Sequence, residues 1–192
     1  IGGNIATNAG GIRVIRYGNT RDWVAGLKLV DGRGELLDLG RALVKNSSGY
    51  DLRHLAVASE GTLGIIVEAT LRLADPPPDS SVMLLALPDF ASLMRVFETL
   101  RARLRLEAFE FFTDRALHHV LAHGAQAPFD ETHPYYVVTE FAAGEAEEGA
   151  ALAAFEHCVG EGWVLDGVIS QSQAQAAQLW RLREGITESL AP

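Results

Sequence analysis

Two polar residues near the end of the sequence have the types and the spacing to hold a carboxylate. Arg183 and Thr187 are four residues apart in a segment that the pattern predicts to be helical, so their side chains share one face. A guanidinium can hold a carboxylate through two parallel hydrogen bonds, and a hydroxyl can add another. Arg181 should face elsewhere. The alternative is that Arg183 pairs with an acidic side chain, such as Glu184, Glu188 or another acid on the surface.

The opening stretch, IGGNIATNAGG (residues 1–11), is uncharged and rich in glycine. Glycine lets a ligand approach the backbone closely, and asparagine and threonine add neutral hydrogen-bonding groups. The stretch therefore has the groups to cradle a pyrophosphate or a sugar chain, although it matches neither Gly-x-Gly-x-x-Gly after a strand nor the Gly-Lys-Ser/Thr phosphate loop. A surface turn with incidental glycines is the alternative. The candidate binding residues are Gly2, Gly3, Asn4, Thr7, Asn8, Gly10 and Gly11.

A second candidate stretch reads SEGTLGIIV, residues 59–67. Gly61 and Gly64 flank a turn that leads into an apolar strand. The edge of such a strand offers N–H and C=O groups to a flat heterocycle, against which Ile65 and Val67 can pack. A plain turn into a strand is the alternative.

Other reactive residue types lack the pattern that their chemistry requires. His119 and His123 have a spacing that can bind zinc, and His118 is adjacent, but no His-Glu-x-x-His pattern accompanies them, which favours a surface helix. The lone cysteine, Cys158, is expected in the core and excludes an intrachain disulfide. The tryptophans at positions 23, 163 and 180 are expected to be core anchors. We therefore expect no metal site and no catalytic residue within this sequence.

The charge is distributed unevenly along the chain. The 192 residues carry a net charge of −9; residues 1–73 hold nine Lys/Arg and seven Asp/Glu, whereas residues 74–192 hold seven and eighteen. The acidic second part excludes nucleic acid as a partner, and the first part can tolerate a small phosphate-bearing ligand. No apolar run approaches the roughly 20 residues of a membrane helix. A cytoplasmic location fits these features and the single cysteine, with membrane association only through partners.

Three consecutive prolines, residues 76–78, divide the chain because they cannot continue a helix or a central strand. We predict one domain over residues 1–75, a linker over 76–81 and a second domain over 82–192. The first is β-rich, with strands over 24–30, 35–39, 63–67 and 69–73. The second alternates strands with helices, which predicts an α+β sandwich of the ferredoxin-like type. Its strands are expected over 82–87, 108–112, 135–141 and 163–170, and its helices over 90–104, 114–122, 145–159 and 172–190, with Asp89 and Thr113 as N-caps.

The combination of motifs resembles a known group of flavoproteins. Residues 1–73 contain, in order, GGNIATNAGG, RYGNTRD, DGRGELL, KNSSGYDLRHL and SEGTLGIIVEATLRL. This order resembles the FAD-binding domain of the vanillyl-alcohol-oxidase-type flavoproteins, and more narrowly the D-lactate, glycolate and D-2-hydroxyglutarate dehydrogenase group. WRLREGITE, residues 180–188, is similar to the substrate-domain helix of that group. The resemblance implies that the C-terminal part of an FAD-binding domain precedes an incomplete α+β substrate (cap) domain.

The resemblance also implies roles for individual residues. FAD would lie along the glycine-rich stretch with its adenine end at residues 61–67, and Arg183 and Thr187 would bind the substrate carboxylate. Glu60 would accept a hydrogen bond from the nucleotide, or cap a turn. The family-type Gly-Ser-Glu-Gly is Ala58-Ser59-Glu60-Gly61 here, which weakens the adenine assignment. The further cofactor-binding residues implied in this way are Tyr17, Gly18, Glu60, Gly61, Gly64, Ile65 and Val67.

Proteins of this group are much longer, so we expect the chain to be an internal piece that is inactive by itself. The parent is expected to oxidise a D-2-hydroxy acid of the lactate, glycolate or 2-hydroxyglutarate type to the 2-oxo acid, by hydride transfer to flavin N5. The active-site base, and the ligands of a divalent metal in metal-dependent members, are expected outside this chain. The expected partners are a small-molecule carboxylate substrate and a separate electron acceptor. The alternatives are an oxidase of another alcohol or sugar, and a non-catalytic scaffold of the same fold.

Overall fold

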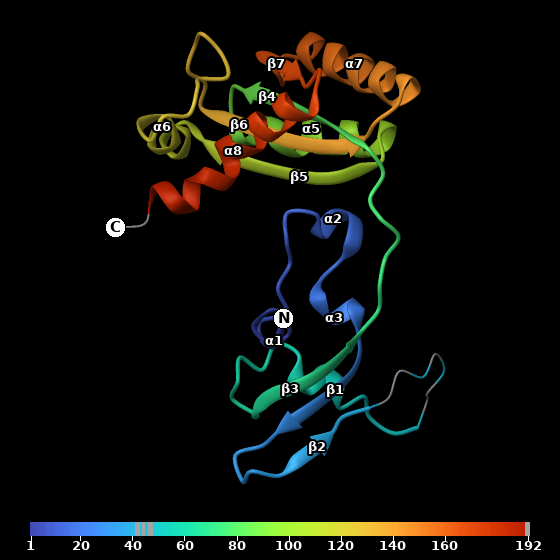
Figure 1. Cartoon of the computed structure of the whole chain (residues 1–192). Coiled ribbons are helices and arrows are strands. Elements are labelled where there is room, and N and C mark those ends of the chain that lie inside the picture. Colours follow the sequence, from blue (N-terminus) through green and yellow to red (C-terminus); the bar gives the residue numbers. More distant parts are fainter. Residues whose placement is uncertain (41–42, 44, 46–47, 191–192) are drawn as a thin grey trace. The chain divides into compact units, whose positions relative to one another are not determined.

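The computed structural model describes residues 1–40, 43, 45 and 48–190. The chain divides into two compact units, Ile1–Pro76 and Pro77–Pro192, and the division lies within the predicted proline linker (Figure 1). Within the described part of the chain, no helix is both long enough and apolar enough to cross a membrane.

The first unit is a three-stranded antiparallel sheet with short helices around it. β1 (Val24–Val30) lies between β2 (Leu36–Asp38) and β3 (Ile65–Leu71). The strands predicted over 63–67 and 69–73 are a single strand, β3, and its pairing with β1 shifts register at Val67, as in a β-bulge. The helices are α1 (Gly2–Ala6), α2 (Val14–Tyr17), α3 (Thr20–Trp23) and α4 (Arg53–Ala56).

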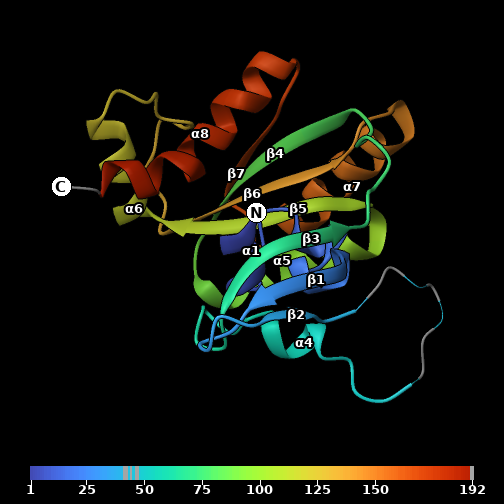
Figure 2. The same cartoon turned by 60° about the horizontal axis from the view of Figure 1, so that its bottom comes forward.

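A small apolar core holds the first unit together. Ile5 of α1 is fully buried and packs with Leu27 and Leu29 of β1 and with Ala56 of α4. Half-buried side chains of β3, among them Ile66, pack against the same core, and α1 lies beside β3 (Figure 2). The core fixes the position of the glycine-rich stretch, because Ile5 is the one large apolar side chain buried within α1.

The second unit is an α+β sandwich around a four-stranded antiparallel sheet. Its strands are β4 (Ser80–Leu87), β5 (Leu106–Thr113), β6 (Tyr135–Ala142) and β7 (Asp166–Ile169), in the spatial order β5-β6-β4-β7. Its helices are α5 (Phe90–Arg103), α6 (Asp114–Ala122), α7 (Glu145–Gly160) and α8 (Gln173–Ser189). The first and third strands of the unit are central, which is the ferredoxin-like order and confirms the predicted class.

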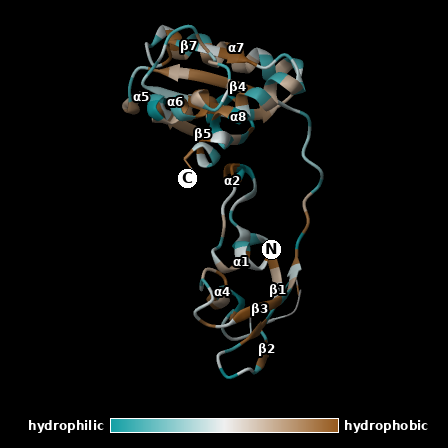
Figure 3. Cartoon of the chain, turned by 60° about the vertical axis from the view of Figure 1, so that its left-hand side comes forward, coloured by the Kyte–Doolittle hydropathy of each residue, from teal (hydrophilic) through white to brown (hydrophobic). Residues whose placement is uncertain are grey.

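Helices cover both faces of this sheet. α5 and α7 pack on the face that carries Met83, Leu85 and Leu87 of β4. α8 lies on the opposite face, against β4, β5 and β6, and α6 packs beside α8 (Figure 1). Because both faces are covered, β4 is apolar along most of its length instead of alternating (Figure 3).

The N-caps of the helices agree with the sequence prediction, whereas strand β7 is shorter than predicted. The side chains of Asp89 and Thr113 accept the amides of the third helical residues, as predicted, and Ser172 caps α8 in the same way. β7 is shorter than the predicted 163–170. The amide of Trp163 instead donates to the carbonyl of Cys158 at 2.9 Å, so this segment closes the end of α7 before the strand begins.

Candidate functional site

The glycine-rich stretch folds into α1 and a turn, not into an open loop. The amides of Thr7 and Asn8 donate to the carbonyl oxygens of Gly3 and Ile5 at 3.0 and 3.1 Å. The side-chain oxygen of Asn8 accepts the amide of Arg21 at 2.9 Å. These hydrogen bonds stabilise the turn itself, so the amides of Thr7 and Asn8 are not available to a ligand. The other residues of the glycine-rich stretch remain candidates for binding the cofactor.

A cleft of about 610 Å³ lies beside this stretch within the first unit. It brings together four of the predicted cofactor residues, Asn4, Gly10, Gly11 and Gly18, with Arg72 as the charged side chain among its walls. The remaining lining residues are Ile1, Ile5, Ala9, Thr20, Trp23 and Leu71. Apart from Arg72, the side chains that line the cleft are therefore uncharged, and three of its lining residues are glycines.

Tyr17 contacts Trp23, which is one of the residues that line this cleft. Its ring meets that of Trp23 edge to face at 6.2 Å, and its carbonyl oxygen accepts the indole N–H of Trp23 at 2.7 Å. Tyr17 is half-buried and is not among the residues that line the cleft. The structure thus assigns Tyr17 a packing contact with a lining residue.

The second candidate stretch meets the first in space. The amides of Ala58 and Glu60 donate to the carbonyl oxygens of Ile5 and Ala6, at 3.2 and 2.9 Å. Ala58 and Glu60 have positive φ angles of 68° and 50°, and Gly61 has one of 79°. This backbone folds against the end of α1, so two stretches that are about 50 residues apart form one surface in the fold.

The strand that follows, β3, packs Ile66, Ala69 and Leu71 against the core but leaves two apolar side chains largely exposed. Ile65 is 72% exposed and Val67 is 55% exposed. Both positions were predicted to pack against a flat heterocycle, and both have free apolar surface in the first unit.

The glycines predicted to bind the cofactor fall into two groups. In the first group, the fold of the unit itself requires glycine. At Gly10, a Cβ would lie 2.8 Å from the side-chain oxygen of Asn19, and Gly18, Gly61 and Gly64 have positive φ angles. Internal packing or backbone conformation therefore accounts for these glycines.

Gly2, Gly3 and Gly11 form the other group. A Cβ at Gly3 or Gly11 would meet no protein atom within 4 Å, one at Gly2 would come only within 3.9 Å, and none of the three has a positive φ. Nothing within the described first unit requires glycine at these positions. Close approach of a ligand would account for the absence of a side chain there.

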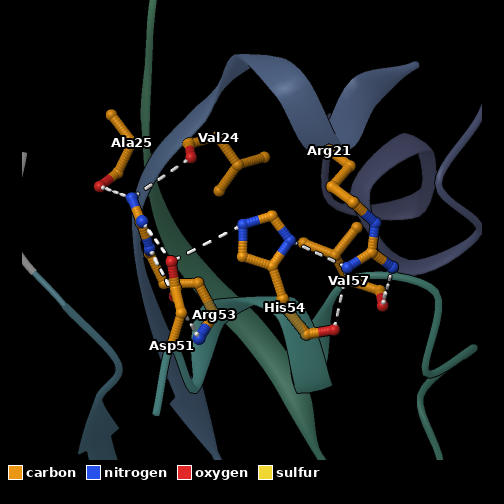
Figure 4. Close-up of polar contacts among 7 residues, drawn as sticks. All are labelled: Arg21, Val24, Ala25, Asp51, Arg53, His54 and Val57. Carbon is orange, nitrogen blue, oxygen red and sulfur yellow. Dashed lines mark hydrogen bonds and ion pairs between the residues drawn. The ribbon is translucent and has the colours of Figure 1, made fainter. Parts of the chain in front are cut away.

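A network of arginine contacts, which the sequence reading did not identify, holds α4 against β1 (Figure 4). Arg53 donates to Asp51 through Nε at 2.8 Å and to the carbonyl oxygen of Ala25. Arg21 contacts Nδ1 of His54 at 2.8 Å. The hydrogen bond from Arg53 lowers the pKa of Asp51 below its ordinary value. The Asp-x-Arg spacing within KNSSGYDLRHL is the signal that could have found this pair; residues 46 and 47 of that motif lie outside the described residues.

In the second unit, Arg183 is paired with an acid from another element. Its Nε donates to Oε2 of Glu110 on β5 at 3.0 Å, and Nη2 lies 2.9 Å from the same oxygen. Thr187 is one turn further along α8 and is exposed. Arg181 faces elsewhere, as expected, and lines a cleft of about 450 Å³ between α6 and α8. Arg183 therefore has an acidic partner, as the alternative considered from the sequence foresaw, but the partner is neither Glu184 nor Glu188.

The histidines near the end of α6 and the lone cysteine, for which the sequence predicted no reactive role, have structural contacts. His123 contacts the backbone carbonyl of His119 at 2.8 Å. Among the described residues, no group of three or more His, Cys, Asp or Glu side chains is arranged to hold a metal ion. Cys158 is fully buried on α7, as predicted, and burial raises the pKa of its thiol.

Comparison with known families agrees with this arrangement of the chain. Residues 76–191 match the model for the C-terminal domain of FAD-linked oxidases, and residues 1–40 match an FAD-binding domain. The chain belongs to the FAD-linked oxidase family. The predicted resemblance, the fold class and FAD as the cofactor are thereby confirmed.

Several relatives of this FAD-linked oxidase chain carry one name. It is 81% identical to a D-2-hydroxyglutarate dehydrogenase of Xanthomonas citri pv. viticola and 54% identical to one of Stutzerimonas stutzeri, in each case over the whole chain. A mitochondrial D-2-hydroxyglutarate dehydrogenase of Bos taurus is 40% identical. The chain spans only 41%, 42% and 36% of these three relatives.

A solved structure of alkyldihydroxyacetonephosphate synthase has the same fold. It aligns with 94% of this chain, at a TM-score of 0.63 and 18% sequence identity, and the match covers 35% of that protein. At this identity the likeness concerns the fold alone.

The residues of the first unit fit the cofactor that the family implies. Its cleft is largely uncharged, and Gly11 borders it without any internal requirement for glycine. A flavin nucleotide carries flat rings and a pyrophosphate, which need apolar surface and closely approaching backbone groups respectively. Both features are present within residues 1–72.

Proposed function

We propose that the full-length protein is an FAD-dependent dehydrogenase that oxidises a D-2-hydroxy acid to the 2-oxo acid. The observation that carries this proposal is the 81% identity, over the whole chain, to a protein named D-2-hydroxyglutarate dehydrogenase. Since further relatives have the same name, D-2-hydroxyglutarate is the favoured substrate ahead of lactate and glycolate. The flavin, when bound, supplies the hydride acceptor at N5.

The two units of this chain have separate tasks in the proposal. In the first, the cleft beside Asn4, Gly10, Gly11 and Gly18 takes part of the FAD. The proposed cofactor surface also includes Gly2, Gly3, Glu60, Gly61, Gly64, Ile65 and Val67. Thr7, Asn8 and Tyr17 support this surface, through the turn after α1 and through the contact of Tyr17 with Trp23.

In the second unit, Arg183 and Thr187 bind the substrate carboxylate. They lie one turn apart on α8, and Arg183 is half-buried while Thr187 is exposed. A partly desolvated guanidinium holds a carboxylate more strongly than one in open solvent. Their contribution is positioning, which fixes the hydroxyl-bearing carbon relative to the cofactor.

A small-molecule carboxylate and a separate electron acceptor are the partners that this reaction requires. We propose a cytoplasmic location, on the basis of the composition and the single cysteine. The relative from Bos taurus is named mitochondrial, so fractionation of the native source decides the location.

The test is a substrate panel with the purified full-length protein. We expect flavin absorbance at a stoichiometry of about one per chain and reduction of an artificial electron acceptor with D-2-hydroxyglutarate, but not with its L enantiomer. Turnover only with an unrelated alcohol or sugar would replace the substrate assignment. A full-length protein that contains no flavin and cannot be reconstituted with it would contradict the enzymatic proposal itself.

The role of Arg183 has a matched control on the same helix. Arg183→Ala should raise KM for D-2-hydroxyglutarate by about 100-fold, the scale of a lost charge-assisted pair, with the FAD content unchanged. Arg181→Ala removes an equal charge from an exposed position two residues away and should leave KM within about twofold. Equal effects of the two substitutions would contradict the carboxylate-binding role.

A further inference from the structure

Arg183 meets Glu110 through one edge of its guanidinium group only. Nε donates to Oε2 at 3.0 Å and Nη2 lies 2.9 Å from that same oxygen. The two parallel bonds of a full carboxylate–guanidinium pair would involve both oxygens, whereas here a single oxygen faces the Nε/Nη2 edge. The pair is therefore an end-on contact that uses only part of the donor capacity of Arg183.

The opposite edge of the guanidinium has donors to spare. A guanidinium has five N–H groups in a fixed planar fork. Within the described part of the chain, Nη1 makes no hydrogen bond, and Nη2 has a second N–H directed away from Glu110. The Nη1/Nη2 edge thus presents two parallel donors, which is the geometry that a second carboxylate needs.

Two secondary-structure elements fix this orientation. Glu110 is on β5 opposite Val138 of β6, on the sheet face that α8 covers, and Arg183 projects from α8. The side chain of Arg183 is 30% exposed and that of Glu110 is 23% exposed, so both are held more firmly than a surface pair. Neither Glu184 nor Glu188 on the same helix forms an ion pair with Arg183.

We propose that Glu110 is a positioning residue, which holds the Nε side of Arg183 so that the Nη1/Nη2 edge is presented to the substrate carboxylate. This inference rests on the proposed function, because it assumes that Arg183 binds the substrate. Glu110 does not touch the substrate in this arrangement. The length of the Glu110 side chain and the position of its accepting oxygen, Oε2, matter more than its negative charge. A shorter side chain would place the oxygen elsewhere and so rotate the guanidinium group of Arg183.

The test uses three substitutions in the full-length, FAD-loaded protein. Glu110→Ala should raise KM for D-2-hydroxyglutarate by about tenfold with kcat within about twofold, because a freed guanidinium loses its orientation before the substrate binds. Glu110→Gln has the same length and can accept the same hydrogen bond, so it should restore KM to within about threefold of wild type. Glu110→Asp keeps the charge but is one methylene shorter, and should resemble Glu110→Ala.

Direct binding gives a readout that is independent of turnover. Calorimetric titration of each variant with 2-oxoglutarate should show the same order of Kd: wild type and Glu110→Gln tight, Glu110→Asp and Glu110→Ala weak. Thermal unfolding separates a structural role, since a lower Tm with unchanged KM and Kd in Glu110→Ala would overturn the proposal. A lower KM in both Glu110→Ala and Glu110→Gln would also overturn it, because Glu110 would then compete with the substrate.

Arg183→Ala distinguishes this proposal from the function on which it rests. If Arg183→Ala leaves KM unchanged, the carboxylate-binding role fails and the positioning role fails with it. If Arg183→Ala raises KM and Glu110→Ala does not, only the positioning role is overturned. The double variant should have the KM of Arg183→Ala alone, because Glu110 acts through Arg183.

Discussion

Gly11→Ala tests most directly whether the cleft of the first unit holds the flavin nucleotide. Gly11 borders the cleft, its φ lies outside the left-handed region, and a Cβ there would meet no protein atom within 4 Å. The folded apoprotein can therefore accept the methyl group. Alanine should stabilise the apoprotein by about 0.4–1 kcal/mol, because it restricts the unfolded chain.

The same methyl group would project into space that a bound cofactor must occupy. Overpacking by one methyl typically costs about 1–3 kcal/mol. That range corresponds to roughly 5- to 150-fold weaker binding of FAD, at 1.4 kcal/mol per tenfold. The substitution should thus have opposite effects on the stability of the apoprotein and on the affinity for the cofactor.

The assay is FAD titration of the full-length apoprotein, followed by the quenching of flavin fluorescence, together with thermal unfolding of the same preparations. Gly32→Ala is the matched control, since Gly32 lies in the turn between β1 and β2, has no positive φ, and has no atom within 4 Å of a Cβ. Equal FAD affinities of the Gly11→Ala and Gly32→Ala proteins would refute the placement of the cofactor in this cleft.

Three further predictions concern stability and reactivity. Ala58→Gly should raise the free energy of unfolding by about 1 kcal/mol in urea denaturation, because Ala58 adopts a left-handed φ of 68° that glycine adopts without strain. The hydrogen bond from Arg53 is the chief cause of the lowered pKa of Asp51. The ionised Asp51 therefore contributes to the free energy of unfolding above its ordinary pKa of 3.8, and this contribution is lost as the pH falls through the lower pKa of the folded state. Asp51→Asn should therefore cost less than about 1 kcal/mol at pH 7, and this cost should shrink as the pH is lowered below 3.8, as measured by unfolding over a series of pH values. Cys158 is buried, and burial raises the pKa of its thiol. A disulfide reagent at pH 8 should therefore label Cys158 only when the second unit unfolds locally, so that labelling is much slower than that of a free thiol. Mass spectrometry of the peptide that contains Cys158 measures this rate.

The second unit could be predicted from the sequence because its elements have local signals. The period of α5, the cap at Asp89 and the cap at Thr113 are each contained within a few residues. Four strands and four helices in alternation then left few topologies, and the observed strand order is that of the ferredoxin-like type that was predicted.

The short helices of the first unit could not be predicted in this way. α1 has five residues, and α2 and α3 have four each, which is about one turn and too little for a period to appear. α1 is held by the burial of Ile5 and not by helix propensity, since it contains two glycines. Tertiary packing therefore decided the conformation of the stretch that the motifs had marked only as open backbone.

The partner of Arg183 was also beyond the reach of local patterns. Glu110 is 73 residues away in the sequence and reaches Arg183 only because α8 covers β5. The contacts of Arg53 with the carbonyl oxygens of Val24 and Ala25 have no signal at all, because every residue has a carbonyl group. The sequence could single out Arg183 as a candidate, but not the acidic side chain that pairs with it.

The small excess of positive charge in residues 1–73 does not predict how the first unit would bind a nucleotide. Arg21 and Arg53 donate to backbone carbonyl oxygens and so hold α4 to the rest of the unit. Lys28 pairs with Glu68 across β1 and β3 at 2.8 Å. These cations serve the fold, and Arg72 is the charged side chain that borders the cleft. We therefore expect phosphate binding in the proposed cleft to depend mainly on the close approach of an uncharged backbone, so that a single methyl group at Gly11 should matter more than the loss of any one of those paired charges.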